Sequence, residues 1–338
     1  MSKLPTRKIG STDVTAIGYG AMGIASYYGT FPPDSERLKL LDALYERGCT
    51  NWDTADVYGD SEELIGRWFK QSGKRDEIFL ATKFGFQSPP PRNKSPDGDP
   101  EYARQAFEKS ISRLGVDHID LWYLHRPDPT VPIEHTVAAM AEFVKAGRVT
   151  YLGLSEVSAS GLRRAHKVHP ISALQVEYSV FTLDIEDPRI NLLNTARELG
   201  VTIVAYAPIG RGLLSGKYKG PEDFEESDYR RTIPKFSKEN FPKILKLADD
   251  LKKIGQKHGA TAAQVCLAWL LAQGPDVIPI PGTRHIEYLD ENLGAFKVKL
   301  SQEEVVQVRK VAEDADLLGE ARYAPGIQEM LFAETPPP

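Results

Sequence analysis

Three apolar runs of the sequence each end on an ionisable residue, and a tyrosine follows the first of them. The runs end at Asp53, Lys83 and His125, and Tyr58 stands five residues after Asp53. If the runs are parallel strands of a closed barrel, their carboxyl ends share one rim, and the four side chains meet there. Such a group of residues could donate a proton to a carbonyl oxygen.

Reduction of a carbonyl by hydride transfer leaves negative charge on the oxygen, so the site needs a proton donor aimed at that oxygen. The phenol of Tyr58 has an unperturbed pKa of about 10, and it becomes acidic enough only beside a cation. Lys83 would be that cation, Asp53 would hold its ammonium group in an ion pair, and His125 would hydrogen-bond the substrate oxygen or supply the proton. We therefore expect Tyr58 to be the general acid.

Each of these residues also has an ordinary structural interpretation. Asp53 could cap a helix, Lys83 could be solvated at a strand end, and His125 could belong to the turn that continues with Arg126 and Pro127. Each interpretation is reasonable for one residue, but together they would have to hold for the whole group. The combination therefore favours a catalytic site.

Short apolar runs alternate with longer segments of helical periodicity along the whole chain. Strands that are apolar throughout and alternate with helices predict a parallel sheet covered on both faces, and eight strands close into a barrel with a filled interior. The expected fold is an α/β (β/α)8 TIM barrel. Its predicted strands are residues 15–20, 50–53, 78–83, 119–125, 149–155, 173–177, 202–206 and 277–281.

Four segments extend this minimal pattern. Residues 7–14 have a hairpin pattern that could close the floor of the barrel, and residues 210–257 form an insertion after the seventh strand, too long for an ordinary loop. A proline-rich loop lies at residues 89–100, and an extra helix with a capping sequence is expected at 301–315, before an irregular tail. We expect residues 1–338 to form one domain, with the barrel proper at about 15–300 and the C-terminal helix and tail at 301–338.

The composition is ordinary for a globular protein, with 41% hydrophobic residues, 26% charged residues and a net charge of −5. No basic cluster suggests a nucleic-acid partner, and the longest apolar run, residues 265–272, is too short to span a bilayer. The N-terminus lacks a signal-peptide pattern, so a cytoplasmic protein is expected, and the sequence gives no indication of oligomeric state. Cys49 and Cys266 stand in apolar surroundings that predict buried thiols, and no metal site is expected.

The stretch Asn51-Trp-Asp-Thr-Ala-Asp-Val-Tyr-Gly59 resembles the signature of the aldo-keto reductases, in which Asp and Tyr five residues apart follow the second barrel strand. The resemblance spans about residues 5–325 and includes Lys83 in Thr-Lys-Phe-Gly and His125 in Leu-Trp-Tyr-Leu-His-Arg-Pro-Asp. It implies that the catalytic residues are Tyr58, Asp53, Lys83 and His125. Within the superfamily, residues 153–158 and 320–325 are similar to microbial and plant pyridoxal reductase-like members and to the potassium-channel β-subunit-like branch.

The resemblance also assigns the remaining strand ends to the cofactor NADPH. Ser155 and Gln175 would hydrogen-bond the nicotinamide carboxamide, and the ring of Tyr206 would stack on the nicotinamide. Residues 207–217 resemble the family's pyrophosphate loop, in which small residues let backbone N–H groups approach the phosphates and Lys217 adds charge. Arg284, after the eighth strand, would bind the 2′-phosphate of the adenosine, which favours NADPH over NADH.

The full set of candidate cofactor residues includes these and the two residues expected at the adenine, Glu291 and Asn292. It comprises Ala21, Met22, Asp53, Ser155, Gln175, Tyr206, Ala207, Pro208, Ile209, Gly210, Leu213, Ser215, Lys217, Gly282, Arg284, Glu291 and Asn292. Candidates for the walls of the substrate pocket are Met22, Tyr27, Tyr28, Phe84 and Trp122.

Two local sequences need separate interpretation. Gly18-Tyr-Gly-Ala-Met-Gly matches the letters of the dinucleotide fingerprint, but residues 24–33 predict a loop where that motif opens a helix, so the glycines favour a tight turn. Many family members have Asn after the residue that corresponds to Ser155, whereas this chain has Glu156. A carboxylate cannot donate to the carboxamide oxygen, so Glu156 either turns away or accepts from the carboxamide amino group.

The main hypothesis is an NADPH-dependent reductase that acts on a small-molecule carbonyl substrate, with pyridoxal and other small aldehydes as candidates. An alternative is a redox-sensing auxiliary subunit like the potassium-channel β-subunits. A barrel aldolase would use Lys83 as a Schiff base, which requires an uncharged amine, whereas a neighbouring Asp53 would keep the lysine protonated.

Overall fold

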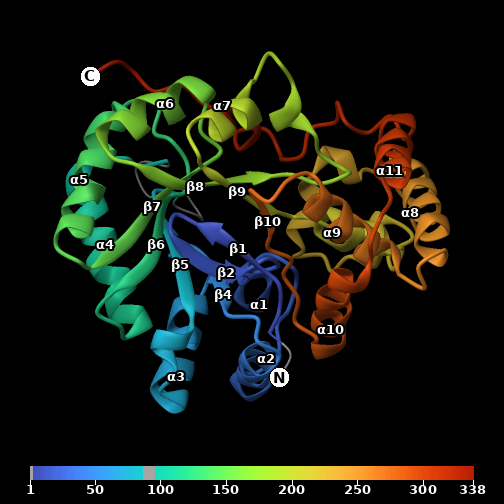
Figure 1. Ribbon diagram of the computed structural model, residues 1–338, viewed down its shortest axis with the longest axis horizontal. Coiled ribbons are helices and arrows are strands. Elements are labelled where there is room, and N and C mark those ends of the chain that lie inside the picture. The colour runs from blue at the N-terminus through green and yellow to red at the C-terminus, as the bar shows by residue number, and fades with distance from the viewer. Residues whose placement is uncertain (1–2, 87–95) are drawn as a thin grey trace.

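Eight parallel strands form a ring in the computed structural model, which describes residues 3–86 and 96–338. The strands pair in chain order, and hydrogen bonds from Gly18 N–H to Pro279 O (3.0 Å) and from Gly20 N–H to Pro281 O (3.3 Å) join the first to the last. The TIM-barrel prediction is therefore confirmed (Figure 1). The strands are β3 (Tyr19–Gly20), β4 (Asn51–Asp53), β5 (Phe79–Phe84), β6 (Ile119–Leu124), β7 (Val149–Ser155), β8 (Ile171–Glu177), β9 (Thr202–Tyr206) and β10 (Val277–Pro279).

The expected N-terminal hairpin is also present, as the antiparallel pair β1 (Thr6–Ile9) and β2 (Thr12–Thr15), and it lies across the centre of the ring in Figure 1. Ile9 and Val14 are buried in one cluster with the inward-facing residues of the barrel strands. The Thr202 hydroxyl, at the start of β9, donates to Lys8 O (2.8 Å). The hairpin therefore covers the amino-terminal end of the barrel, opposite the carboxyl ends of the strands.

Helices cover the outside of the ring and alternate with the strands, as the periodicity predicts. Gly48, Gly147 and Gly200 follow three of these helices with φ of +76°, +72° and +70°, the left-handed conformation that commonly ends a helix. Asp34 and Ser61 are the first residues of two of these helices, and Pro33 and Asp60 precede them as caps. The covering helices are α2 (Asp34–Glu46), α3 (Ser61–Ser72), α4 (Pro100–Leu114), α5 (Ile133–Lys145), α6 (Ala159–Val168), α7 (Leu192–Glu198), α9 (Ala262–Ala272) and α10 (Ile286–Gly294).

The predicted insertion after β9 carries helical structure of its own, including α8 (Phe241–Gln256). The extra C-terminal helix is α11 (Gln302–Asp314), and its capping box between Ser301 and Glu304 is formed as predicted. Short elements complete the description: α1 (Met22–Ala25) and the 3₁₀ turns η1 (Arg75–Glu77), η2 (Asp184–Glu186), η3 (Gly210–Ser215), η4 (Pro221–Asp223), η5 (Tyr229–Thr232), η6 (Pro234–Phe236), η7 (Ala295–Lys297) and η8 (Gln328–Met330).

The C-terminal tail crosses from α11 to α6, as the red trace in Figure 1 shows. Phe332 N–H donates to Glu156 O (2.8 Å), and Arg164 on α6 donates to Thr335 O (2.8 Å). These contacts hold the irregular tail against the loops that follow the carboxyl ends of the strands.

Four predictions remain to be compared with the structure. Cys49 and Cys266 are buried free thiols, as expected. Across residues 3–86 and 96–338, no helix combines the length and apolar character needed to cross a membrane. The proline-rich loop falls largely outside the described residues, and the single-domain assignment remains a prediction.

Candidate active site

The four predicted catalytic side chains come together at the carboxyl ends of three neighbouring strands. Asp53 ends β4, Lys83 lies near the end of β5, and His125 follows β6. Tyr58 stands in the turn after β4, where Gly59 adopts φ +55° and a side chain at that position would collide with Ala25 O. The turn therefore requires glycine at this position to carry Tyr58 back over the strand ends.

The Lys83 ammonium group is fully buried and directs its donors at three acceptors. It forms an ion pair with Asp53, donates to Thr54 O (2.7 Å) and donates to the Tyr58 hydroxyl oxygen (3.5 Å). Asp53 also accepts from the Gln175 amide (2.7 Å). Burial raises the pKa of Asp53 and lowers the pKa of Lys83, and the attraction between the two charges opposes both shifts.

The other contact of the Tyr58 hydroxyl is with His125 Nε2, at 3.5 Å. Burial and the charge of Asp53 raise the pKa of Tyr58 well above its ordinary value, so the phenol holds its proton at neutral pH. Burial and the charges of Arg126 and Lys83 lower the pKa of His125 well below its ordinary value. A neutral imidazole favours the predicted role of hydrogen-bonding the substrate oxygen over the role of supplying a proton.

These residues open into a cavity of about 660 Å³ at the carboxyl end of the barrel. Tyr58 and His125 line it, and so do Lys217, after β9, and Arg284, after β10, from the strands opposite β5 and β6 in the ring. The predicted cofactor residues that line the cavity are Met22, Asp53, Ser155, Gln175, Tyr206, Ala207, Pro208, Ile209, Ser215, Lys217, Gly282, Arg284, Glu291 and Asn292. The other three, Ala21, Gly210 and Leu213, are buried behind this lining.

The cavity has the features that a phosphate-bearing nicotinamide cofactor requires. Two cationic side chains, Lys217 and Arg284, lie on one side of the ring, and Tyr58, the predicted proton donor, lies on the other. Within the described ranges, no three His, Cys, Asp or Glu residues are arranged to hold a metal ion.

Glu156 does not face the expected nicotinamide position. Its fully buried carboxylate forms an ion pair with Arg322 (2.9 Å) and accepts from the Tyr206 hydroxyl (2.7 Å) and from Glu177 N–H (3.0 Å). Burial alone would raise the pKa of Glu156, but the charges of Arg322 and Arg126 hold this pKa below its usual value. Of the two alternatives drawn from the sequence, the structure favours the one in which Glu156 turns away.

Sequence reasoning missed two arginines at this rim. Arg126 is buried and lines the cavity, and Nη1 donates to the Ser155 hydroxyl (3.2 Å). The position of Arg126 directly after His125 is consistent with a place at the active site, but it is equally typical of a residue in a turn. Arg322 lies in an irregular tail without periodicity, so the sequence carries no sign that it reaches Glu156.

The prediction of pocket-wall residues is wrong for two of the five. Met22, Tyr27 and Tyr28 line the cavity, whereas Phe84 and Trp122 pack on the outside of the strands. The rings of Phe84 and Trp122 stack with centroids 4.5 Å apart, and Trp122 also meets Phe107 of α4 at 5.0 Å. Since strand residues alternate between the two faces of the sheet, both side chains belong to the layer under the helices.

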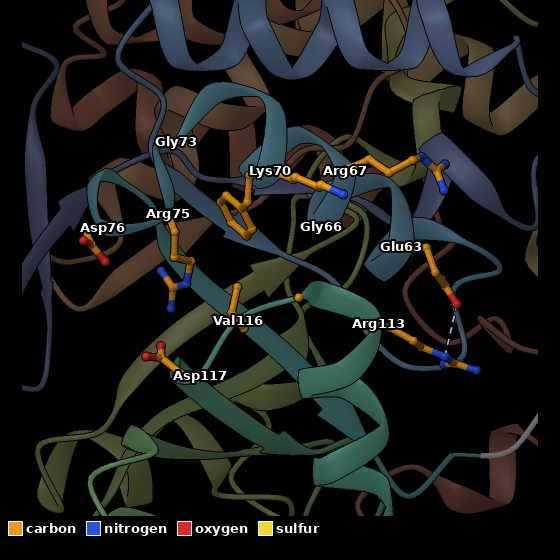
Figure 2. Close-up of a pocket in the computed structure, with 12 residues that line it drawn as sticks. Glu63, Gly66, Arg67, Lys70, Gly73, Arg75, Asp76, Arg113, Val116 and Asp117 are labelled. Atoms are coloured by element: carbon orange, nitrogen blue, oxygen red, sulfur yellow. Dashed lines mark ion pairs between the residues drawn. The ribbon is translucent and has the colours of Figure 1, made fainter.

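A second cavity, of about 790 Å³, lies on the outside of the barrel between α3 and α4 (Figure 2). Figure 2 shows Arg113 paired with Glu63, at 3.2 Å, on one side of it. Arg75 pairs with Asp120 (2.8 Å), and none of the predicted catalytic residues lines this cavity. It therefore offers no group for the chemistry described above.

Comparison with known proteins agrees with this geometry. The model of the aldo/keto reductase family matches residues 16–313. Aldo-keto reductase str7 of Strobilurus tenacellus is 60% identical over 338 residues, covering 98% of this chain and 99% of its own. The NADP(+) aldo-keto reductase yakc of Schizosaccharomyces pombe is 49% identical and covers 99% of this chain and 98% of its own.

Solved structures are similar as well. The thermostable aldo-keto reductase Tm1743, in complex with the inhibitor epalrestat, has a TM-score of 0.73 and 31% identity, covering 91% of this chain and 100% of its own. Glycerol dehydrogenase AKR11B4 from Gluconobacter oxydans has a TM-score of 0.81 and 28% identity, covering 92% of this chain and 96% of its own.

Proposed function

The chain belongs to the aldo/keto reductase family, and we propose that it reduces a small aldehyde or ketone to the alcohol with NADPH, with Tyr58 as the proton donor. The observation that carries this proposal is the Tyr58 hydroxyl, which lies 3.5 Å from both Lys83 Nζ and His125 Nε2 in the main cavity. A carbonyl oxygen placed beside it would meet a protonated phenol and a neutral imidazole.

The contacts suggest how the proton moves. Because Lys83 donates to the Tyr58 oxygen, the proton of Tyr58 is free to point at the substrate. As charge develops on the carbonyl oxygen, Tyr58 donates this proton, and the ammonium group of Lys83 stabilises the phenolate that remains. Asp53 and Thr54 O fix the position of that ammonium group, and NADPH in the cavity would supply the hydride.

The choice of NADPH is supported by two features. Lys217 and Arg284 line the cavity and would hold its phosphates, and Ser155, Gln175 and Tyr206 line the same cavity and would contact the nicotinamide. The relative yakc, which is 49% identical, is named for NADP(+). The complete catalytic group favours an enzyme over an auxiliary subunit, and we keep pyridoxal and other small aldehydes as candidate substrates.

The proposal is tested by incubating the protein with NADPH and a panel of aldehydes that includes pyridoxal, and by following NADPH consumption by absorbance. We expect consumption with at least one aldehyde and the matching alcohol as product. Quenching of NADPH fluorescence on binding is measured in parallel, so that loss of cofactor binding can be told from absence of a suitable substrate. Binding of NADPH without turnover of any carbonyl compound would contradict the proposal.

A further inference from the structure

Arg126 is a buried cation at the wall of the active-site cavity, directly after His125. It is 5% exposed, and Nη1 donates to His125 O (2.7 Å) and to the Ser155 hydroxyl (3.2 Å). Nε is buried without a hydrogen-bond partner, and Nη2 makes no hydrogen bond within the described residues. Two donor atoms of the guanidinium group, the enclosed Nε and Nη2, are therefore unused among the described residues.

The other buried arginine side chains of the described residues are all neutralised by a carboxylate. The pairs are Arg37 with Asp60 (2.7 Å), Arg211 with Glu177 (3.1 Å), Arg230 with Asp228 (2.6 Å) and Arg322 with Glu156 (2.9 Å). Within residues 3–86 and 96–338, Arg126 has no such ion pair. A buried charge without a counter-charge is costly, so its retention calls for an explanation.

The surroundings of Arg126 lower the free-energy cost of burying its charge but do not remove that cost. The guanidinium carbon lies 5.8 Å from the ring of Phe86 and 6.0 Å from the ring of Tyr323, distances at which aromatic faces attract a cation. The nearby charges of Lys83 and Asp53 cancel each other, and those of Glu156 and Arg322 do the same. Arg126 therefore leaves an unbalanced positive charge beside the catalytic residues.

We propose that Arg126 binds a carboxylate of the substrate, so that the preferred substrates are carbonyl compounds that also carry a carboxylate close to the carbonyl. Arg126 lines the cavity, and its Nη2 makes no hydrogen bond among the described residues, so this N–H donor is left for a carboxylate oxygen, an acceptor that guanidinium groups bind well. One unbalanced charge matches a monoanion better than a phosphate, which carries about −1.5 to −2.

The placement of Arg126 relates the anion to the reacting carbonyl. Phe86 packs against His125, with ring centroids 5.5 Å apart, and also against Arg126. The carboxylate and the carbonyl oxygen would therefore occupy neighbouring positions along one wall of the cavity. This inference rests on the proposed function, because it names the substrate class of the same site.

The test uses the three positional isomers of carboxybenzaldehyde and the methyl ester of each, which keeps the aldehyde and removes the charge. Turnover of each compound with NADPH is measured for the wild type, Arg126→Gln and Arg126→Lys. We expect at least one acid to have a lower KM than its ester in the wild type. Arg126→Gln should raise the KM of that acid roughly tenfold to hundredfold, with kcat little changed and the ester affected less than threefold, as loss of hydrogen bonds to a charged group predicts.

Two further measurements separate this role from others. Benzoate should compete with the ester in the wild type and not in Arg126→Gln, and Arg126→Lys should recover part of the preference for the acid. Equal losses for acid and ester, together with weaker NADPH binding by fluorescence, would assign Arg126 to the cofactor and overturn the proposal. If no acid is preferred over its ester by the wild type, the proposal is wrong even if the variants do not fold. Failure of the proposed function is distinct, because neither acids nor esters would then be reduced.

Discussion

The rim of the barrel holds two buried polar clusters that differ in how completely their groups are paired. The catalytic cluster, on β4 to β6, consists of Asp53, Tyr58, Lys83, His125 and Arg126. The tail cluster, on β7 to β9 and the C-terminal tail, consists of Glu156, Glu177, Tyr206, Arg322 and Tyr323.

In the tail cluster, Arg322 contacts Glu156 at 2.9 Å and Asp184 at 3.0 Å, and Glu156 accepts from the Tyr206 hydroxyl at 2.7 Å. In the catalytic cluster, by contrast, the contacts of the Tyr58 hydroxyl with Lys83 and His125 are 3.5 Å long, and His125 Nδ1 and Arg126 Nε have no partner among residues 3–86 and 96–338. Fully paired buried groups stabilise a fold, and incompletely paired groups mark where a ligand completes the hydrogen bonding. We therefore expect substitutions in the catalytic cluster to reduce activity and substitutions in the tail cluster to reduce stability.

The largest expected effect is on turnover, from Tyr58→Phe. Removing the hydroxyl should lower kcat by roughly 10²–10⁴-fold, because the developing charge on the substrate oxygen loses its proton donor. Thermal unfolding should be nearly unchanged, since the ring remains in place and the lost contacts are long. The measurement is NADPH consumption with the preferred aldehyde, and a variant with full turnover would exclude Tyr58 as the acid.

The next largest effect is on stability, from Arg322→Met. Removing one partner of a buried ion pair should cost about 3–5 kcal/mol in the free energy of unfolding, because Glu156 is left charged and unpaired. Urea unfolding of the variant should show this cost, and the double variant Glu156→Gln/Arg322→Met should recover much of it. A matched control is Arg309→Met, whose pair with Glu186 is partly exposed, at 32% and 22%, and should cost about 1 kcal/mol or less. Equal costs for both arginines would remove the distinction between the clusters.

The two clusters also differ in how far the sequence predicts them. The proposed catalytic residues stand at the ends of regular apolar strands, so the alternation of strands and helices is enough to bring Asp53, Lys83 and His125 to one rim. Arg322 reaches Glu156 through an irregular tail, and no periodic pattern records such a long-range contact. The same limit explains Phe84 and Trp122, because strands that are apolar on both faces do not show which side chains face the interior.

The pH dependence of stability gives a third test, on His125. Its pKa is lowered well below the ordinary value of 6.5 by burial, Arg126 and Lys83. As the pH falls through 6.5, the unfolded chain therefore binds a proton at His125 that the folded chain excludes. The stability of the folded state is unaffected by this group above pH 6.5 and decreases as the pH falls below it. Between about pH 7.5 and 5.5 the loss should be roughly 1 kcal/mol, and His125→Gln should remove it.

The comparison of wild type and His125→Gln isolates this effect from other groups. Burial raises the pKa of Asp56 to about 8, so lowering the pH favours the folded state at that residue and opposes the effect of His125. Asp56 is present in both proteins, and its contribution cancels in the difference between their unfolding curves. Identical pH profiles for the two proteins would show that His125 is not held neutral.

The smallest effect is expected at the outer cavity of Figure 2, where the arginines Arg67, Arg75 and Arg113 are in ion pairs and partly exposed. Arg67 lies 2.8 Å from Asp34 and 3.5 Å from Asp60, and its side chain is 41% exposed. Arg67→Gln should therefore change the free energy of unfolding by less than about 1 kcal/mol, because water screens such pairs. It should leave kcat and KM unchanged, although this cavity, at about 790 Å³, is larger than the active-site cavity, at about 660 Å³. If Arg67→Gln changed kcat or KM, the outer cavity would take part in function. Cavity size would then be a better guide to function in this protein than incomplete pairing of buried groups.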